Sequence, residues 1–291
     1  MNSMNSMDEQ RPESLPRRQT DPAWLQDHFL ETGHDETTRS ATFTFIKRRN
    51  RHYAVTCRHV MEAISDPKMV PGARFPTIAI HIDRAVLNLS YFTAKGLSLG
   101  VGAPHAETKR EEIDVAIAPI DGSYWGLLTS KKNKMAIDLD NWREPKWDAV
   151  KYCLAAGYSD EKKTKVTTGG AEKVSSQLFV VVAEVSSRLA RSERQITLSS
   201  LLDKAHGYYF SGMSGGPVYA VEGHAERQVE DEELFPVGII FEGHPSSGRA
   251  DMEGSKDGAS VFLTERDLFF RALTLTPELF DEWLQKAGVP A

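Results

Sequence analysis

The chain alternates short β-type runs with turn-forming residues, and this pattern constrains the fold more than any other feature. In the first half, β-branched, aromatic and other apolar residues cluster at 41–46, 52–56, 78–82, 91–93 and 115–117. In the second half they cluster at 150–158, 178–183, 196–198, 208–210, 218–221, 237–241 and 260–263. No segment of helical period separates the first-half runs. Many short strands joined by turns predict an all-β barrel or sandwich.

Residues 212–217 read Gly-Met-Ser-Gly-Gly-Pro, which places a serine among glycines. Glycine permits a tight turn on which the backbone can approach a substrate closely. On such a turn the amides of Gly212 and Ser214 can point the same way, towards a developing oxyanion. A serine hydroxyl becomes a good nucleophile only when a histidine removes its proton and a carboxylate orients that histidine. The turn therefore requires a histidine and an acid elsewhere in the chain.

Two upstream elements supply them. His59 closely follows the β-type run at 52–56, and Asp114 opens the alternating apolar run at 115–120. The order is His59, Asp114, Ser214, with separations of 55 and 100 residues. Taken singly, each element is readily explained as a turn or a structural residue. The combination, in this order and at this spacing, predicts a catalytic triad.

In these elements the chain resembles the chymotrypsin-like (trypsin-fold) serine peptidases, more specifically the non-zymogen intracellular bacterial type, over residues 36–270. The resemblance implies two six-stranded antiparallel β-barrels with the triad at their junction. It implies His59 as general base and acid, Asp114 as its orienting partner and Ser214 as nucleophile. The amides of Gly212 and Ser214 would form the oxyanion hole. The implied activity is serine endopeptidase, acting on peptide or protein substrates through an acyl-enzyme without a metal or other cofactor.

A competing interpretation reads 212–216 as Gly-x-Ser-x-Gly, the nucleophile elbow of α/β-hydrolases. That elbow must lead directly into a helix, whereas here two glycines and a proline lead into the β-type run at 218–221. The hydrolase order also needs an acid and then a histidine after the serine. Asp231 and His244 would form an implausibly cramped pair, so the elbow is rejected.

Several residues near the serine bear on activation and specificity. Met213 stands where zymogen-activated relatives carry an aspartate, so activation by a new N-terminal amine is not expected. The oxyanion loop is then either permanently ordered or ordered by a partner or substrate. The resemblance places Tyr208 near the base of the substrate pocket, which favours small or apolar side chains. Phe241 and Gly243 would flank Glu242 in a strand that pairs with substrate, and Glu242 either attracts basic side chains or is solvated rim.

Composition limits the partners that we expect. The formal net charge of −6 gives no general attraction to nucleic acids or anionic membranes. Basic clusters at 47–51 and 131–134 lie between expected strands, as solvated surface usually does. Residues 1–9 lack the apolar stretch of a signal peptide, and no run reaches the ~20 apolar residues that cross a bilayer. We therefore expect a cytoplasmic bacterial protein with no nucleic-acid or membrane partner.

The two cysteines, Cys57 and Cys153, fit free buried thiols in a reducing compartment. Secreted relatives join the residue after the catalytic histidine to a disulfide, but Val60 occupies that position here. Cys57 and His59 are close enough in sequence to suggest a metal pair. Neither a Cys-x-x-Cys motif nor a second histidine at ligand spacing accompanies them, so we expect no metal.

The chain divides into four segments. Residues 1–20 form a polar tail. Residues 21–135 hold a short N-terminal helix at 21–30 and the first barrel, and residues 136–272 hold the second barrel, with a connector at about 122–147 between the halves. Residues 273–291 carry a C-terminal helix that begins after Thr276 and packs on the barrels. Two alternatives to a constitutive peptidase stay open: a peptidase activated by a protein partner, and a non-catalytic trypsin-fold module that binds peptides or proteins.

Overall fold

The computed structural model of this chain describes residues 29–32, 41–60, 79–82, 85–88, 98–101, 113–120, 122–132, 134–168, 171–185, 194–203, 212–223, 233–243, 248–251, 260–264 and 266–289. Several predictions fall outside these residues: the tail at 1–20, residues 21–28 of the N-terminal helix, the run at 91–93 and Tyr208. No helix of the described segments is long and apolar enough to cross a membrane.

The first half folds into a sheet in which the strand order is β5-β4-β1-β2-β3-β7-β6. These strands are β1 (Phe29–Thr32), β2 (Ala41–Arg48), β3 (Arg51–Thr56), β4 (Ala79–Ile82), β5 (Ala85–Asn88), β6 (Ser98–Val101) and β7 (Ile113–Ile120). An eighth strand, β8 (Ile137–Asp138), pairs in parallel with β2. The predicted hairpin at 41–56 is confirmed, with β2 and β3 joined through Arg49 and Asn50. Both turn residues have positive φ angles, of 49° and 58°, as a two-residue hairpin turn of type I′ requires.

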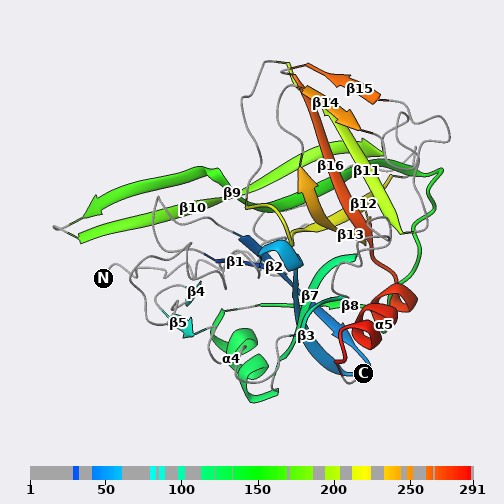
Figure 1. The fold of residues 1–291 in the computed structure, drawn as a ribbon. Helices are drawn as coiled ribbons and strands as arrows, with labels where there is room; N and C mark the ends of the chain where they lie inside the picture. The colour runs from blue at the N-terminus through cyan, green and yellow to red at the C-terminus, as the bar shows by residue number, and fades with distance from the viewer. Residues whose placement is uncertain are drawn as a thin grey trace, which may run out of the picture.

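The second half contains a closed barrel of six antiparallel strands in the order β10-β11-β16-β13-β12-β9. Its strands are β9 (Val150–Thr168), β10 (Ala171–Val185), β11 (Gln195–Leu201), β12 (Pro217–Glu222), β13 (Glu233–Gly243) and β16 (Asp267–Thr274). Strands β14 (Gly248–Asp251) and β15 (Ser260–Leu263) form a separate pair. In Figure 1 the barrel lies beside the first sheet, and β9 and β10 continue beyond it as a long hairpin.

The expected all-β class is confirmed, but the expected pair of six-stranded antiparallel barrels is only half seen. In the described residues, the first sheet is open because its end strands β5 and β6 do not pair with each other. It also contains a parallel pair, β2 with β8. The β8 segment crosses into the first sheet, where Ile137 pairs with Ile46. Strand β8 thus belongs to the first sheet, and β9 is the first strand of the barrel; the division of the chain into domains stays a prediction.

The helices differ from the sequence-based expectation in two places. Helix α4 (Gly122–Lys132) occupies the predicted connector, where its Trp125 ring stacks on His52 at 4.2 Å. The helix lacks a regular apolar stripe, and tertiary packing of this aromatic ring supports it instead. At the N-terminus, Phe29 and Leu30 belong to β1 and pair with β2, so the predicted helix at 21–30 is wrong over these residues. Pairing with a neighbouring strand here overrides local capping signals.

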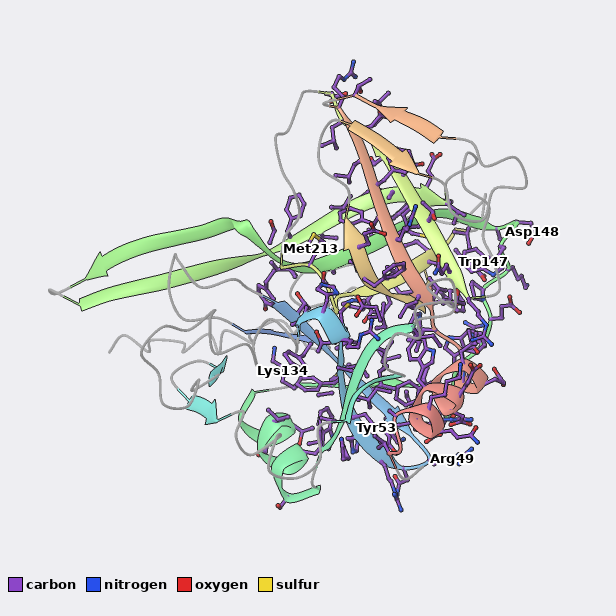
Figure 2. All side chains as sticks on the ribbon, in the orientation of Figure 1. Arg49, Tyr53, Lys134, Trp147, Asp148 and Met213 are labelled. Carbon is purple, nitrogen blue, oxygen red and sulfur yellow. The ribbon has the colours of Figure 1, made fainter. Side chains whose placement is uncertain are left out.

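The C-terminal helix α5 (Pro277–Lys286) is confirmed, and Thr276 caps it by accepting a hydrogen bond from the Leu279 amide at 3.2 Å. Its buried Phe280 packs edge-on against Tyr53 of the first sheet, with ring centroids 5.5 Å apart. One buried apolar cluster joins first-sheet, barrel and α5 residues, and a second fills the barrel. Figure 2 shows Tyr53 beside α5 and Met213 where the barrel meets the first sheet.

Candidate active site

His59 lies in a helical turn at residues 58–60 that directly follows β3. Cys57 and Val60 on either side are buried, and Phe241 of the barrel packs against both. The His59 side chain itself remains 48% exposed. The apolar contacts thus anchor the backbone of the turn and leave the imidazole at the surface, where a substrate can reach it.

Asp114 is the second residue of β7, which pairs with β3 so that Ala116 lies opposite Thr56. This register brings the Asp114 carboxylate beside His59. Oδ1 accepts a hydrogen bond from the His59 backbone amide at 3.0 Å, and Oδ2 accepts a short one from His59 Nδ1. With Nδ1 donating its proton, Nε2 of the neutral imidazole is the acceptor. The carboxylate therefore fixes both the ring orientation and the tautomer.

Ser214 reaches the opposite edge of the same ring. Its Oγ lies 3.2 Å from His59 Nε2, within hydrogen-bonding distance. The histidine and aspartate come from the first sheet and the serine precedes β12 of the barrel, so the three side chains meet where the two halves touch. The structure thus brings together the three residues that the sequence pattern selected.

The charge state of Asp114 suits an orienting role. Burial is the largest influence on its carboxyl pKa and acts to raise it. Hydrogen bonds from His59 and the charges of His59 and Arg58 act in the opposite direction, and the net effect lowers the pKa below its ordinary value. Asp114 is therefore ionised at neutral pH and can stabilise an imidazolium when His59 gains a proton.

The nucleophile loop, residues 212–216, depends on two glycines in the left-handed region. Gly212 and Gly215 have φ angles of 93° and 90°, which side-chain-bearing residues rarely adopt. A Cβ on Gly215 would lie 2.0 Å from the Thr42 carbonyl oxygen. The loop can therefore approach β2 this closely only with glycine at this position.

In the described part of the loop, the amides of Gly212, Met213 and Ser214 have no protein acceptor. The Met213 carbonyl accepts a hydrogen bond from Gly216 N at 2.9 Å. In a trans peptide the N–H points opposite to the carbonyl, so this bond also directs the Ser214 amide away from the loop interior. Both amides predicted for an oxyanion hole lie in the loop and keep their donors available.

Met213 is fully buried and belongs to the apolar cluster inside the barrel. No charge is available at this position to order the loop. Its side chain instead anchors the loop in the barrel beside Gly157, whose Cβ position is 3.0 Å from Met213 Cα. The residue next to the nucleophile thus contributes packing rather than an ion pair.

The predicted substrate residues have mixed outcomes. In the part of the chain that the structure describes, Glu242 and Gly243 of β13 pair with β16, the register shifts at Phe241, and β12 ends its pairing at Ile239. None of the described strands pairs with residues 241–243 on their other side. The Phe241 side chain packs inward against Cys57 and Val60. Glu242 is paired with Arg271 at 3.2 Å, which weakens its predicted attraction for basic side chains.

Two buried threonines of β2 were missed by the sequence reasoning. Thr42 and Thr44 are fully buried, and their hydroxyls donate to the loop carbonyls of Gly212 at 2.9 Å and Gly215 at 2.7 Å. Their alternation with Phe43 and Phe45 was a visible signal, since residues two apart share a strand face. The pattern showed that two polar side chains share one face of the strand, but it could not show which part of the chain they would contact.

Cys57, His59 and Asp114 are also close enough to suggest a metal site, since each offers a ligand atom within 4.8 Å of the others. Burial raises the pKa of the Cys57 thiol well above its ordinary value, and the Asp114 charge adds to the effect. The thiol donates a hydrogen bond to the Ile240 carbonyl at 3.2 Å. His59 and Asp114 are hydrogen-bonded to each other, and the Cys57 thiol is directed at a backbone carbonyl instead, so the observed contacts are those of an orienting His–Asp pair beside a buried thiol.

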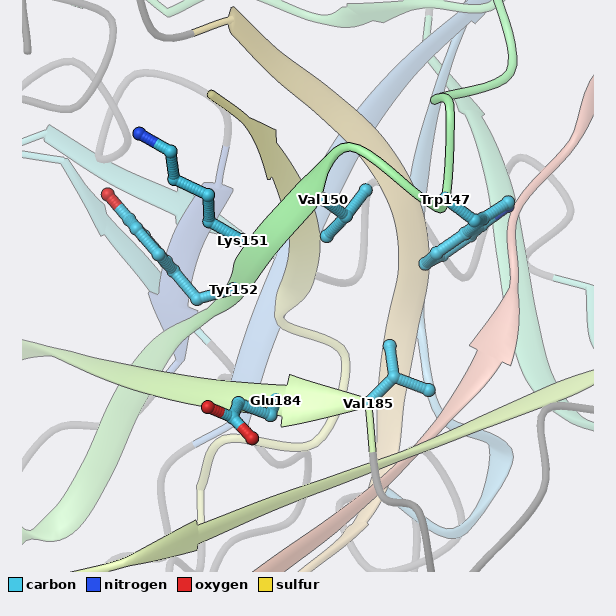
Figure 3. A pocket seen from close by; sticks show the side chains of 6 residues that line it. All are labelled: Trp147, Val150, Lys151, Tyr152, Glu184 and Val185. Carbon is cyan, nitrogen blue, oxygen red and sulfur yellow. The ribbon is translucent and has the colours of Figure 1, made fainter. Parts of the chain in front are cut away.

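A cavity of about 590 Å³ opens elsewhere on the barrel, around the start of β9 and the end of β10 (Figure 3). Its described lining consists of Trp147, Val150, Lys151, Tyr152, Glu184 and Val185. This set contains no nucleophile with a neighbouring base, and no triad residue lines the cavity. Despite its size, this cavity is therefore not assigned as the candidate active site.

No protein-family model matches this chain, and no curated protein matches its sequence. Solved structures that this chain weakly resembles include the thermostable serine protease AL20 from an extremophilic microorganism. The two share 10% identity over 91% of this chain and 98% of that chain, with a TM-score of 0.41. The tobacco vein mottling virus protease shares 10% identity over 94% of this chain and 88% of that chain, with a TM-score of 0.39. Protease Anisep from Arthrobacter nicotinovorans shares 10% identity over 89% of this chain and 93% of that chain, with a TM-score of 0.39. Similarities this weak carry no argument about function, which rests on the triad geometry.

Proposed function

We propose that this chain is a serine endopeptidase of the trypsin-fold type that cleaves peptide bonds through an acyl-enzyme. One observation carries the proposal: a single imidazole contacts a carboxylate at Nδ1 and a serine hydroxyl at Nε2. The serine also lies on a glycine turn with two available amides. Nucleophile, base, orienting acid and oxyanion donors are the complete set that acyl transfer needs.

The proposed reaction follows from this geometry. Ser214 Oγ attacks the carbonyl carbon of the scissile bond while His59 Nε2 takes its proton. The amides of Gly212 and Ser214 stabilise the resulting oxyanion, and the ionised Asp114 stabilises the imidazolium. His59 then gives the proton to the departing amine, which leaves an ester on Ser214. Water, deprotonated by His59, hydrolyses this ester and regenerates the enzyme.

The proposed substrate is an extended peptide that adds to β13 at residues 241–243, on the side that faces away from β16. Backbone pairing there would place the scissile bond beside Ser214, while specificity would depend on the pocket that the resemblance assigns to Tyr208. A preference for small or apolar side chains stays a prediction, as do a cytoplasmic location and a bacterial origin. The open first sheet is proposed as the counterpart of the first barrel of the family.

The test is incubation with a fluorophosphonate probe followed by mass spectrometry of the labelled peptide. We expect the label on Ser214 of the wild-type chain and none on the Ser214→Ala variant. Labelling only after addition of cell lysate would favour activation by a partner. A folded wild-type chain that stays unlabelled with and without lysate would contradict the enzyme proposal and favour the peptide-binding module.

A further inference from the structure

Every carbonyl group of the nucleophile loop receives a hydrogen bond from within the chain. Residues 212–216 contribute five carbonyl oxygens to a tight turn. A buried carbonyl without a hydrogen-bond donor would be costly there. The donors, in order along the loop, are Thr42 Oγ1 at 2.9 Å, Gly216 N at 2.9 Å, Thr42 N at 3.1 Å, Thr44 Oγ1 at 2.7 Å and Ile240 N at 2.8 Å. Strand β2 supplies three of these five donors, so the first sheet holds the loop of the barrel.

Thr42 has the central position in this set. Its backbone amide donates to the Ser214 carbonyl and its hydroxyl donates to the Gly212 carbonyl. The same hydroxyl oxygen accepts from the Tyr158 amide at 3.0 Å, which leaves its proton for Gly212. Thr56 in turn donates its hydroxyl to the Thr42 carbonyl at 2.9 Å. Thr42 is thus held by β3 of the first sheet and by β9 of the barrel.

These bonds fix peptide planes rather than side chains. The Gly212 carbonyl belongs to the peptide before Met213, and the Ser214 carbonyl belongs to the peptide after the nucleophile. Holding both planes restricts the rotations that would turn the amides of Gly212 and Ser214 out of position. The bonds are uncharged, and Met213 between them is buried in apolar contacts.

We propose that Thr42 is a positioning residue that locks the nucleophile loop in its ordered state, so that the site is competent without an activating partner. This inference rests on the proposed peptidase function, because a competent site presupposes a reaction. It also decides between the two routes left open by Met213, in favour of a permanently ordered loop.

The space around Thr42 explains why a small change should be measurable. A Cβ on Gly157 would lie 3.1 Å from Thr42 Oγ1, which is tighter than an ordinary van der Waals contact. A displaced hydroxyl therefore has little room to move. Thr42→Val keeps the shape and removes the donor, whereas Thr42→Ser keeps the donor and removes a methyl group.

The experiment measures two properties of the full-length chain and its variants. The first is fluorophosphonate labelling of Ser214, resolved into the maximal rate and the half-saturating probe concentration. The second is hydrogen exchange of the peptide that spans residues 212–216. Ile46→Val is the control, because Ile46 is equally buried on β2 but lies in the apolar core away from the loop. Gly157→Ala is a second perturbation if Thr42→Val fails to fold, because its Cβ would lie 3.1 Å from Thr42 Oγ1 and 3.0 Å from Met213 Cα of the loop.

We expect Thr42→Val to lower the maximal labelling rate by at least about 10-fold. This loss should be smaller than the 10²–10³-fold loss that follows when an oxyanion donor is removed outright. The half-saturating concentration should stay unchanged and loop exchange should accelerate about 10-fold or more, since the lost bond is worth roughly 1–3 kcal/mol. Thr42→Ser and Ile46→Val should stay close to wild type. Wild-type rate and exchange in Thr42→Val, or in Gly157→Ala in its place, overturn the inference. An unlabelled wild-type chain refutes the peptidase proposal instead, and exchange still reports whether Thr42 holds the loop.

Discussion

Strand β2 contacts the rest of the molecule at both ends, and the two contacts use different chemistry. Near its start, the buried threonines Thr42 and Thr44 bond to the nucleophile loop through uncharged groups. At its end, Arg48 forms a two-point ion pair with Asp281 of α5, at 3.0 Å and 2.7 Å. The loop contact has no spare volume, whereas the helix contact is partly open to water.

This difference indicates how each contact should respond to change. Buried hydrogen bonds between close-packed backbones tolerate neither added atoms nor lost partners. Solvated ion pairs are individually weak and screened by salt. The same strand therefore makes a rigid contact at the proposed active site and, at the C-terminal helix, a contact that tolerates substitution.

Asp114→Asn, on β7 beside the residues that the rigid contact positions, should give the largest effect on activity. The amide can no longer hold His59 in the tautomer with an acceptor at Nε2, and it cannot stabilise an imidazolium. We expect a fall in labelling or turnover rate of about 10⁴-fold, with circular dichroism of the folded chain unchanged. A loss of less than tenfold would show that Asp114 does not orient the histidine.

A pair of glycine variants separates crowding at the loop contact from backbone strain alone. Gly215→Ala places a Cβ against the Thr42 carbonyl and strains a φ of 90°, so we expect a loss of more than about 4 kcal/mol in unfolding free energy. Gly288→Ala, after α5, strains a φ of 66° but meets no atom within 4 Å. It should lose only about 1–2 kcal/mol. Equal losses in urea denaturation would show that crowding of the loop against β2 adds nothing to backbone strain, which would contradict a rigid contact there.

Asp281→Asn tests the helix contact. It removes the charge that pairs with Arg48 and Arg49, so we expect a loss of about 1 kcal/mol in unfolding free energy at low salt. The loss should shrink at 1 M salt because of screening. Labelling of Ser214 should stay at the wild-type rate. Any large fall in labelling would mean that α5 is coupled to the site.

The pH dependence of stability should carry the smallest signal. The pKa of Asp281 is lowered chiefly by its hydrogen bond from Arg48, and that of Asp114 is lowered by His59 and Arg58 against the larger, opposing effect of burial. A carboxyl with a lowered folded-state pKa contributes stability above its unfolded pKa near 3.9 and loses it as pH falls through the lower folded value. Unfolding measured from pH 5 to pH 2 should therefore be less steep in Asp281→Asn than in the wild-type chain. Identical profiles would contradict the proposed contribution of this pair.

The sequence predicted local elements well where local signals were strong. The β2–β3 hairpin and the Thr276 cap of α5 carried their own turn and capping chemistry. Helix α4 and strand β1 were missed because their stability depends on partners: Trp125 on His52 for the helix, and β2 for the strand. The closure of a sheet was equally invisible, since it depends on whether end strands meet.

By itself, the sequence determined the residue types that acyl transfer requires and their order along the chain, because a glycine turn around a serine and a histidine after a strand are local patterns. Only the tertiary structure decided that His59, Asp114 and Ser214 meet, through the pairing of β3 with β7 and the contact of β2 with the nucleophile loop. It also selected Thr42, whose neighbours on the loop lie 170 residues away. Contacts over such separations depend on how whole sheets pack, and no local pattern specifies them.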